Sequence, residues 1–92
     1  MKPERIRLFI KRSCGWCDEA SDWLDARGFE YEQLDVTVNP ASRREMLALS
    51  GQTLAPVIEV DGQVLADFGT DELENWWREE GFATHGGKGS AD

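Results

Sequence analysis

Cysteine and histidine are scarce in this sequence of 92 residues, which contains two cysteines and one histidine. Small secreted domains are stabilised by several disulfides, and two cysteines three positions apart cannot form such a framework. A structural zinc site takes four ligands, which is more than these residues supply. We therefore expect a chain that folds by hydrophobic packing, holds no metal within one copy, and keeps both cysteines for chemistry.

Long apolar runs are also lacking, and so is an excess of basic charge. The first seven residues are rich in charge, and no later run approaches the roughly 20 apolar residues of a transmembrane helix. The formal net charge is −8, whereas nucleic-acid phosphates attract a basic surface. These features predict a cytoplasmic protein, with no membrane and no nucleic-acid partner, in a compartment that keeps thiols reduced.

Charge is distributed unevenly along the chain. Residues 1–12 carry five of the ten basic residues and one of the eighteen acidic ones, which leaves +4 in this segment and −12 in the rest. One interpretation is a solvated surface whose acidic bias aids solubility. The other is that the basic segment, which ends directly before Cys14, favours a thiolate there. The basic residues are Lys2, Arg5, Arg7, Lys11 and Arg12.

The length allows one domain, predicted over residues 1–82, followed by a flexible tail rich in Gly, Ser and Ala over 83–92. Apolar patterns predict strands over 6–10, 29–38, 57–60 and 64–66, with Asp61-Gly62 as a hairpin turn between the last two. Three helices are predicted: one capped by Ser13 and ended by Gly28, one opened by Asn39-Pro40 and ended by Ser50-Gly51, and one capped by Thr70 or Asp71.

The resulting order, β-α-β-α-β-β-α, predicts an α/β fold. A βαβ opening gives two parallel strands with a right-handed crossover, and the closing hairpin adds an antiparallel pair. We expect a four-stranded mixed sheet flanked by three helices. Trp76 and Trp77 of the last helix are interpreted as packing residues.

The pair Cys14 and Cys17 encloses Gly15-Trp16 at the junction of the first strand and the first helix. Backbone N–H groups and the dipole at a helix N-terminus stabilise a thiolate, which favours Cys14 as the reactive thiol. Cys17 lies one helical turn further on and can close a disulfide onto Cys14. The pattern favours thiol–disulfide exchange over a purely structural role.

The sequence resembles a glutaredoxin of the thioredoxin superfamily over roughly residues 5–81. Lys11-x-x-Cys14-x-x-Cys17 is similar to the family's active-site motif, and Gly51 to Pro56 is similar to the loop that carries its cis-proline. Gly69-Thr70-Asp71-Glu72-Leu73 is similar to the stretch that opens its last helix, although Asp67-Phe68 takes the place of the family's Ile-Gly and the segment from Asp61 to Leu73 is about two residues longer than typical. The resemblance implies a thioredoxin-like, glutaredoxin-type fold.

The resemblance also implies glutathione as co-substrate. The γ-glutamyl carboxylate would lie at Thr70 and Asp71, and the glycyl carboxylate would meet Lys11 and Arg43. Ala55, next to Pro56, would offer its backbone to the peptide, and Trp16 would lie exposed beside the thiols. Thr70 and Asp71 can also be ordinary helix caps, and Arg43 can be a solvated helix residue.

The expected activity is a monomeric dithiol glutaredoxin that reduces glutathionylated or disulfide-containing proteins, with Cys14 attacking and Cys17 resolving. Three alternatives stay open. One is a thioredoxin-like reductant of a dedicated protein, and another is a non-catalytic binding module. The third is a [2Fe–2S] carrier bridged by glutathione between two chains, which Gly15 keeps open because family members with Gly after the first cysteine tend to bind clusters.

Overall fold

The computed structural model describes residues 2–85 and confirms the predicted order of elements. The seven elements are β1 (Ile6–Ile10), α1 (Gly15–Ala26), β2 (Glu32–Asp35), α2 (Pro40–Ser50), β3 (Val57–Val60), β4 (Gln63–Ala66) and α3 (Thr70–Glu79). Strand β2 is shorter than the predicted 29–38. Phe29 leaves the strand because it is buried among the helices and its N–H donates to the Leu24 C=O.

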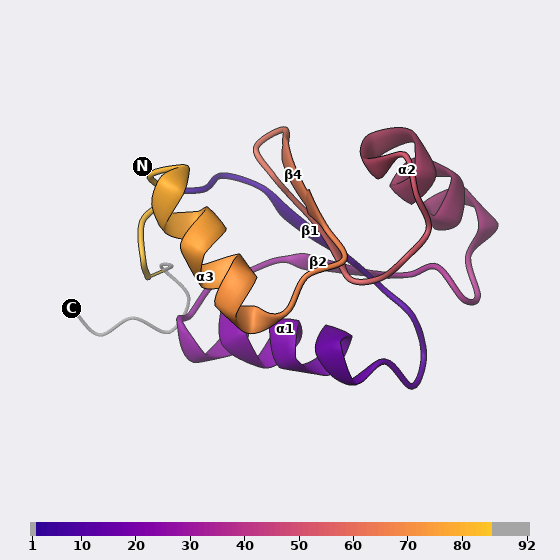
Figure 1. Ribbon diagram of the computed structural model, residues 1–92, viewed down its shortest axis with the longest axis horizontal. Coiled ribbons are helices and arrows are strands. Elements are labelled where there is room, and N and C mark those ends of the chain that lie inside the picture. The colour runs from indigo at the N-terminus through magenta and orange to yellow at the C-terminus, as the bar shows by residue number, and fades with distance from the viewer. Residues whose placement is uncertain (1, 86–92) are drawn as a thin grey trace.

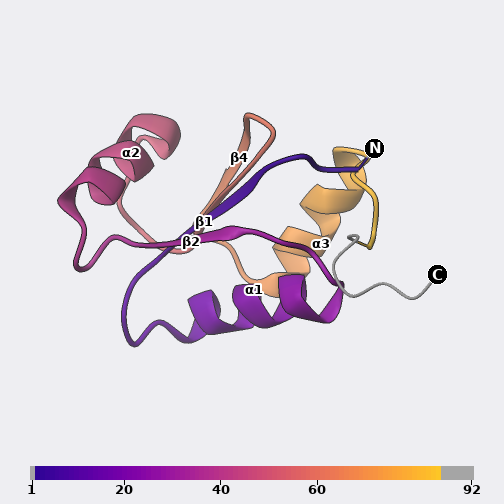
Figure 2. The ribbon, with the colours of Figure 1, turned by 180° about the vertical axis from the view of Figure 1, so that it is seen from behind.

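The four strands form one mixed sheet in the order β2-β1-β3-β4. Strand β1 pairs parallel with β2, and β3 pairs antiparallel with β4, as predicted; β1 also pairs antiparallel with β3. Figures 1 and 2 show α1 and α3 together on one face of the sheet and α2 alone on the other. The result is a three-layer α/β fold with the predicted four-stranded mixed sheet and three helices.

The core on the α1 and α3 face is rich in aromatic side chains. Trp77 is 2% exposed, and its ring centroid lies 5.1 Å from that of Trp23 and 4.9 Å from that of Phe29. Phe82, just beyond α3, packs on Trp77 at 5.2 Å. Trp77 is therefore a packing residue, as predicted, and these rings fix the two helices to each other.

The core on the α2 face is smaller and includes a buried cation. Arg7 of β1 donates from Nε to Glu59 Oε1 at 2.6 Å and lies 2.8 Å from the Glu45 carboxylate of α2. Burial lowers the pKa of the guanidinium, but the hydrogen bonds to Glu45 and Glu59 outweigh it, so the net pKa is raised. Arg7 thus stays charged and links α2 to the sheet.

Turn chemistry explains where α2 and the hairpin begin and end. Asn39 Oδ1 accepts hydrogen bonds from the N–H groups of Ala41 and Ser42, which caps α2 as predicted. Gly51 ends α2 with φ +73°. Asp61 and Gly62 both have positive φ, as a type I′ turn requires.

The described chain continues past α3 to His85. Ala83 accepts a hydrogen bond of 2.7 Å from Trp77 Nε1. Residues 86–92 of the predicted tail, and Met1, lie outside the described residues, so the boundary between domain and tail stays a prediction. None of the helices described over residues 2–85 has the length and apolar character to cross a membrane.

Candidate active site

The three segments that carry the sequence motifs lie at the same end of the sheet. Val57, the first residue of β3, pairs with Phe9 near the end of β1 and with Ala66 at the end of β4. Neighbouring strand ends are therefore joined to all three segments. These are the turn that leaves β1 for Cys14, the loop that enters β3 after Pro56, and the turn that leaves β4 for α3. The fold brings the three motifs to one edge although they are far apart in the sequence.

Cys14 itself is the N-cap of α1. Its Sγ accepts a hydrogen bond of 3.2 Å from the Cys17 N–H, and its C=O accepts from the Asp18 N–H at 3.1 Å. The prediction that Ser13 is the cap was wrong by one residue, because Ser13 has φ +58° and serves as the turn before the helix. The sulfur therefore takes the position of the capping oxygen, where a helix N-terminus stabilises negative charge.

Cys17 differs from Cys14 in accessibility. Cys17 is 1% exposed, whereas Cys14 is half-buried, and both are free thiols. Burial, together with the hydrogen bond and negative charge of Cys14, raises the pKa of the Cys17 thiol to about 12. Only the thiolate is nucleophilic, so the buried Cys17 is the less reactive of the two sulfurs.

We predict that alkylation distinguishes the two thiols. Because a raised pKa keeps Cys17 protonated up to a pH of about 12, its reaction with iodoacetamide should gain about tenfold per pH unit between pH 7 and 9 and stay slow throughout. Cys14 should be labelled first at every pH. Time-resolved peptide mass spectrometry of the native protein measures both rates. Equal labelling of both cysteines at pH 7 would contradict the assignment.

The basic segment before Cys14 is mostly neutralised. Arg5 lies 3.2 Å from Glu32, Arg12 lies 3.6 Å from Asp35, and Arg7 is buried in its own ion pairs. Lys11, in the turn after β1, is half-buried. It forms no ion pair with any side chain of residues 2–85. The sequence pattern therefore overstated the positive field near Cys14, since it could not foresee these partners.

The start of α3 differs from the predicted cap. Gly69, not Thr70 or Asp71, is the N-cap, and it offers no side-chain acceptor to the first turn. The Glu72 carboxylate accepts from the Gly69 N–H at 2.8 Å. The backbone N–H groups of the first turn thus have no side-chain cap, which is the arrangement that binds carboxylates at helix N-termini.

Asp67 and Phe68, which precede Gly69, have a structural role. Phe68 is 1% exposed in the core shared with α1 and α3, and Asp67, with φ +53°, donates its N–H to the Pro56 C=O at 2.8 Å. This pair therefore supplies a core side chain and connects the turn into α3 to the loop of Pro56.

The Ala55–Pro56 peptide bond is cis. No group among residues 2–85 is hydrogen-bonded to the N–H or C=O of Ala55, so both remain available to an extended peptide. Leu54, which precedes Ala55, is 57% exposed, and Trp16 is 53% exposed. The exposure of Trp16 was predicted from the sequence, whereas that of Leu54 was not, although an apolar residue in a polar loop could have indicated it.

Arg43 lies exposed in the first turn of α2 and forms no ion pair among the described residues. That part of the chain also holds no group of three or more His, Cys, Asp or Glu side chains placed to bind a metal ion. Cys14 is the accessible thiol of residues 2–85. A [2Fe–2S] cluster would therefore need ligands from outside this chain.

Comparison with known proteins places this geometry in context. The sequence profile of the glutaredoxin family matches residues 6–65. The chain is 32% identical to glutaredoxin 3 of Escherichia coli over 68 residues, which cover 74% of this chain and 80% of that one. The crystal structure of the thioredoxin-like protein BC3987 covers 77% of this chain and 97% of its own, with 25% identity and a TM-score of 0.71. A crystal structure of a buckwheat glutaredoxin–glutathione complex matches with a TM-score of 0.64 and 22% identity, and the match covers 82% of this chain and 69% of that one.

Proposed function

The chain belongs to the glutaredoxin family and is a thiol–disulfide oxidoreductase, and from this premise we propose that it reduces glutathionylated and disulfide-containing proteins with glutathione as electron donor. The observation that supports this most is the inequality of its two sulfurs. Cys14 is accessible and caps α1, while Cys17 is buried and protonated beneath it. Such a pair separates an attacking thiol from a resolving thiol.

The proposed reaction begins with the Cys14 thiolate. It attacks one sulfur of the substrate disulfide, a new S–S bond forms to Cys14 Sγ, and the other sulfur leaves as a thiolate that takes a proton from water. The Cys17 thiol then passes its proton to the leaving substrate sulfur and attacks Cys14 Sγ, which forms the Cys14–Cys17 disulfide and releases the second substrate thiol. Two molecules of glutathione reduce this disulfide and leave as oxidised glutathione. Alternatively, glutathione attacks the adduct. Two molecules of glutathione supply the two electrons of each cycle.

Glutathione would bind across the edge where the three motifs meet. The free N–H and C=O of Ala55, beside Pro56, would pair with the peptide backbone of the ligand. The γ-glutamyl group would bind the uncapped first turn of α3 at Thr70 and Asp71. A buckwheat relative of similar fold has been crystallised with glutathione, which supports this choice of ligand.

Arg43 and Lys11 would hold the glycyl carboxylate. We predict that Arg43→Gln raises the KM for glutathione about threefold to fivefold, which is the effect of losing one exposed ion pair, and leaves kcat unchanged. Arg44→Gln is the matched control, because Arg44 is also exposed on α2 but points in a different direction around the helix. Steady-state kinetics with a glutathionylated peptide measure both. Equal effects of the two variants would remove Arg43 from the site.

A second candidate is a reductant of one dedicated protein, recharged by a reductase. The exposed side chains of Trp16 and Leu54 favour it, because exposed apolar residues that flank a reactive thiol suit a protein partner. Insulin-disulfide reduction by this protein, driven either by glutathione with glutathione reductase or by thioredoxin reductase with NADPH, separates the two. Turnover with glutathione alone supports the first candidate, and turnover with thioredoxin reductase alone supports the second.

We also propose that the protein acts as a monomer in the cytosol, where a reduced glutathione pool is available. Size-exclusion chromatography with light scattering tests the oligomeric state, and a dimer in reducing buffer would contradict it.

A further inference from the structure

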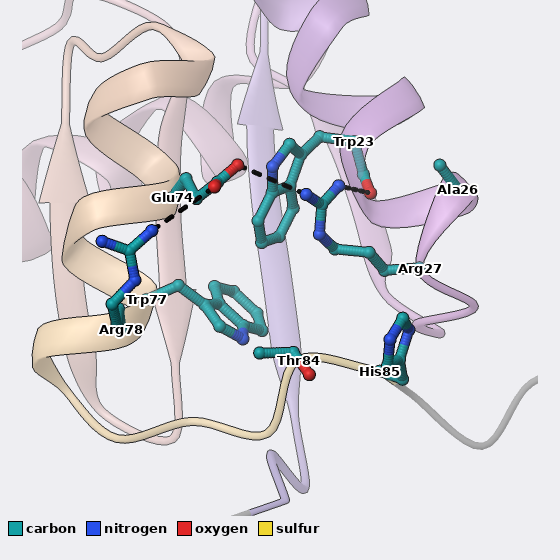
Figure 3. A pocket seen from close by; sticks show the side chains of 8 residues that line it. All are labelled: Trp23, Ala26, Arg27, Glu74, Trp77, Arg78, Thr84 and His85. Carbon is teal, nitrogen blue, oxygen red and sulfur yellow. Dashed lines mark hydrogen bonds and ion pairs between the residues drawn. The ribbon is translucent and has the colours of Figure 1, made fainter.

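A cavity of about 390 Å³ lies between the C-terminal half of α1, α3 and the segment after α3 (Figure 3). This size falls within the range of small-molecule sites, roughly 300–1,000 Å³. Arg27, at the end of α1, lines the cavity, while Cys14 caps the start of the same helix. A helix of this length spans about 18 Å, so the cavity is separate from the thiols.

The inner wall of the cavity is aromatic. It is formed by Trp23 and Trp77, whose rings meet edge to face, and the Arg27 guanidinium carbon lies 3.9 Å from the centroid of the Trp23 ring. The guanidinium and the indole thus form a layered surface that suits another planar group. The Nε1 of Trp77 donates to Ala83, but the buried Nε1 of Trp23 has no partner among residues 2–85.

The rim of the cavity carries more positive than negative charge. Arg27 and Arg78 both approach the Glu74 carboxylate, at 3.3 Å and 3.4 Å. Figure 3 shows Glu74 between the two guanidinium groups and His85 on the opposite side of the opening. These contacts are longer than the roughly 2.7–2.9 Å of a strong charged hydrogen bond, and each guanidinium has further N–H donors. The lining therefore carries one more positive than negative charge, and its guanidinium groups keep N–H donors for an anionic ligand.

We propose that this cavity is a second ligand site, which binds a small planar aromatic carboxylate. The ring would stack on the outer face of the Arg27 guanidinium, which already lies over Trp23, and the carboxylate would accept hydrogen bonds from Arg78. The site neither uses the thiols nor depends on the proposed glutathione chemistry.

Binding of 2-naphthoate to the full-length protein tests the proposal by NMR of the indole N–H signals. We expect saturable shifts of the Trp23 and Trp77 signals with a Kd below about 1 mM, while the Trp16 signal beside Cys14 stays in place. The neutral analogue 2-naphthamide should bind about tenfold more weakly, because it loses the charge-assisted hydrogen bonds. Cys14→Ser should leave the affinity unchanged.

Arg27→Gln should also weaken 2-naphthoate binding about tenfold, while Arg44→Gln on the distant helix α2 should not. The comparison of naphthoate with naphthamide on the native protein gives a result even if the Arg27 variant is unstable. Absence of saturable shifts, equal affinity for the acid and the amide, or shifts centred on Trp16 would each overturn the proposal.

Discussion

Replacing Cys14 by serine is expected to abolish turnover of a glutathionylated peptide, by about three orders of magnitude or more, because a serine hydroxyl is not ionised at neutral pH and cannot form the mixed disulfide. The Cys17→Ser variant should keep a substantial part of this activity, since glutathione itself can reduce the adduct on Cys14. The coupled assay with glutathione reductase measures both variants at equal protein concentration.

The effect of replacing Cys17 is expected to depend on the substrate. With a protein disulfide in place of a glutathionylated peptide, Cys17→Ser should lose most of its activity too, because the resolving thiol is then needed to release the partner. Circular dichroism of both variants controls for folding. Equal losses on the glutathionylated peptide would mean that the two sulfurs do not have the unequal roles that their burial indicates.

The second large effect is on stability. Arg7→Ala is expected to lower the free energy of unfolding by about 3–5 kcal/mol, because it leaves the Glu59 carboxylate, only 17% exposed, without its cation. A domain of this size has about 5–15 kcal/mol in total, so the variant should be close to unfolding at 37 °C. Urea denaturation followed by tryptophan fluorescence measures the change.

A double variant separates charge burial from packing. Arg7→Leu together with Glu59→Leu removes both buried charges and should recover most of the lost stability, as replacement of buried ion pairs by apolar residues often does. Glu45→Gln should cost about 1 kcal/mol or less, because the Glu45 side chain is 46% exposed. If Arg7→Ala lost no more stability than Glu45→Gln, the buried ion pair would have no structural importance.

Local rules were sufficient for much of the fold. Some features depend only on the backbone of a few neighbouring residues and can therefore be predicted from the sequence. They are the Asn39 cap before Pro40, the positive φ of Gly28 and Gly51, and the Asp61-Gly62 turn. The motif around Cys14 is equally local. These signals placed the elements in the right order and the reactive thiol at the start of α1.

Features that depend on tertiary contacts could not be predicted from the sequence. Arg7 was counted with the basic segment before Cys14, yet its partners Glu45 and Glu59 are 38 and 52 positions away. The third helix was assigned a cap at Thr70 or Asp71, but Gly69 takes that place because Phe68 is drawn into the core just before it. The Trp23–Trp77 cavity likewise needs two helices and the segment that follows α3.

The most direct test of the account is the site of the glutathione adduct. Each single variant, Cys14→Ser and Cys17→Ser, is incubated with oxidised glutathione at pH 7 and analysed by peptide mass spectrometry. We expect one glutathione on Cys14 of the Cys17→Ser variant and essentially none on Cys17 of the Cys14→Ser variant, because only Cys14 is accessible and Cys17 is held protonated. An adduct on Cys17, or none on Cys14, would contradict it.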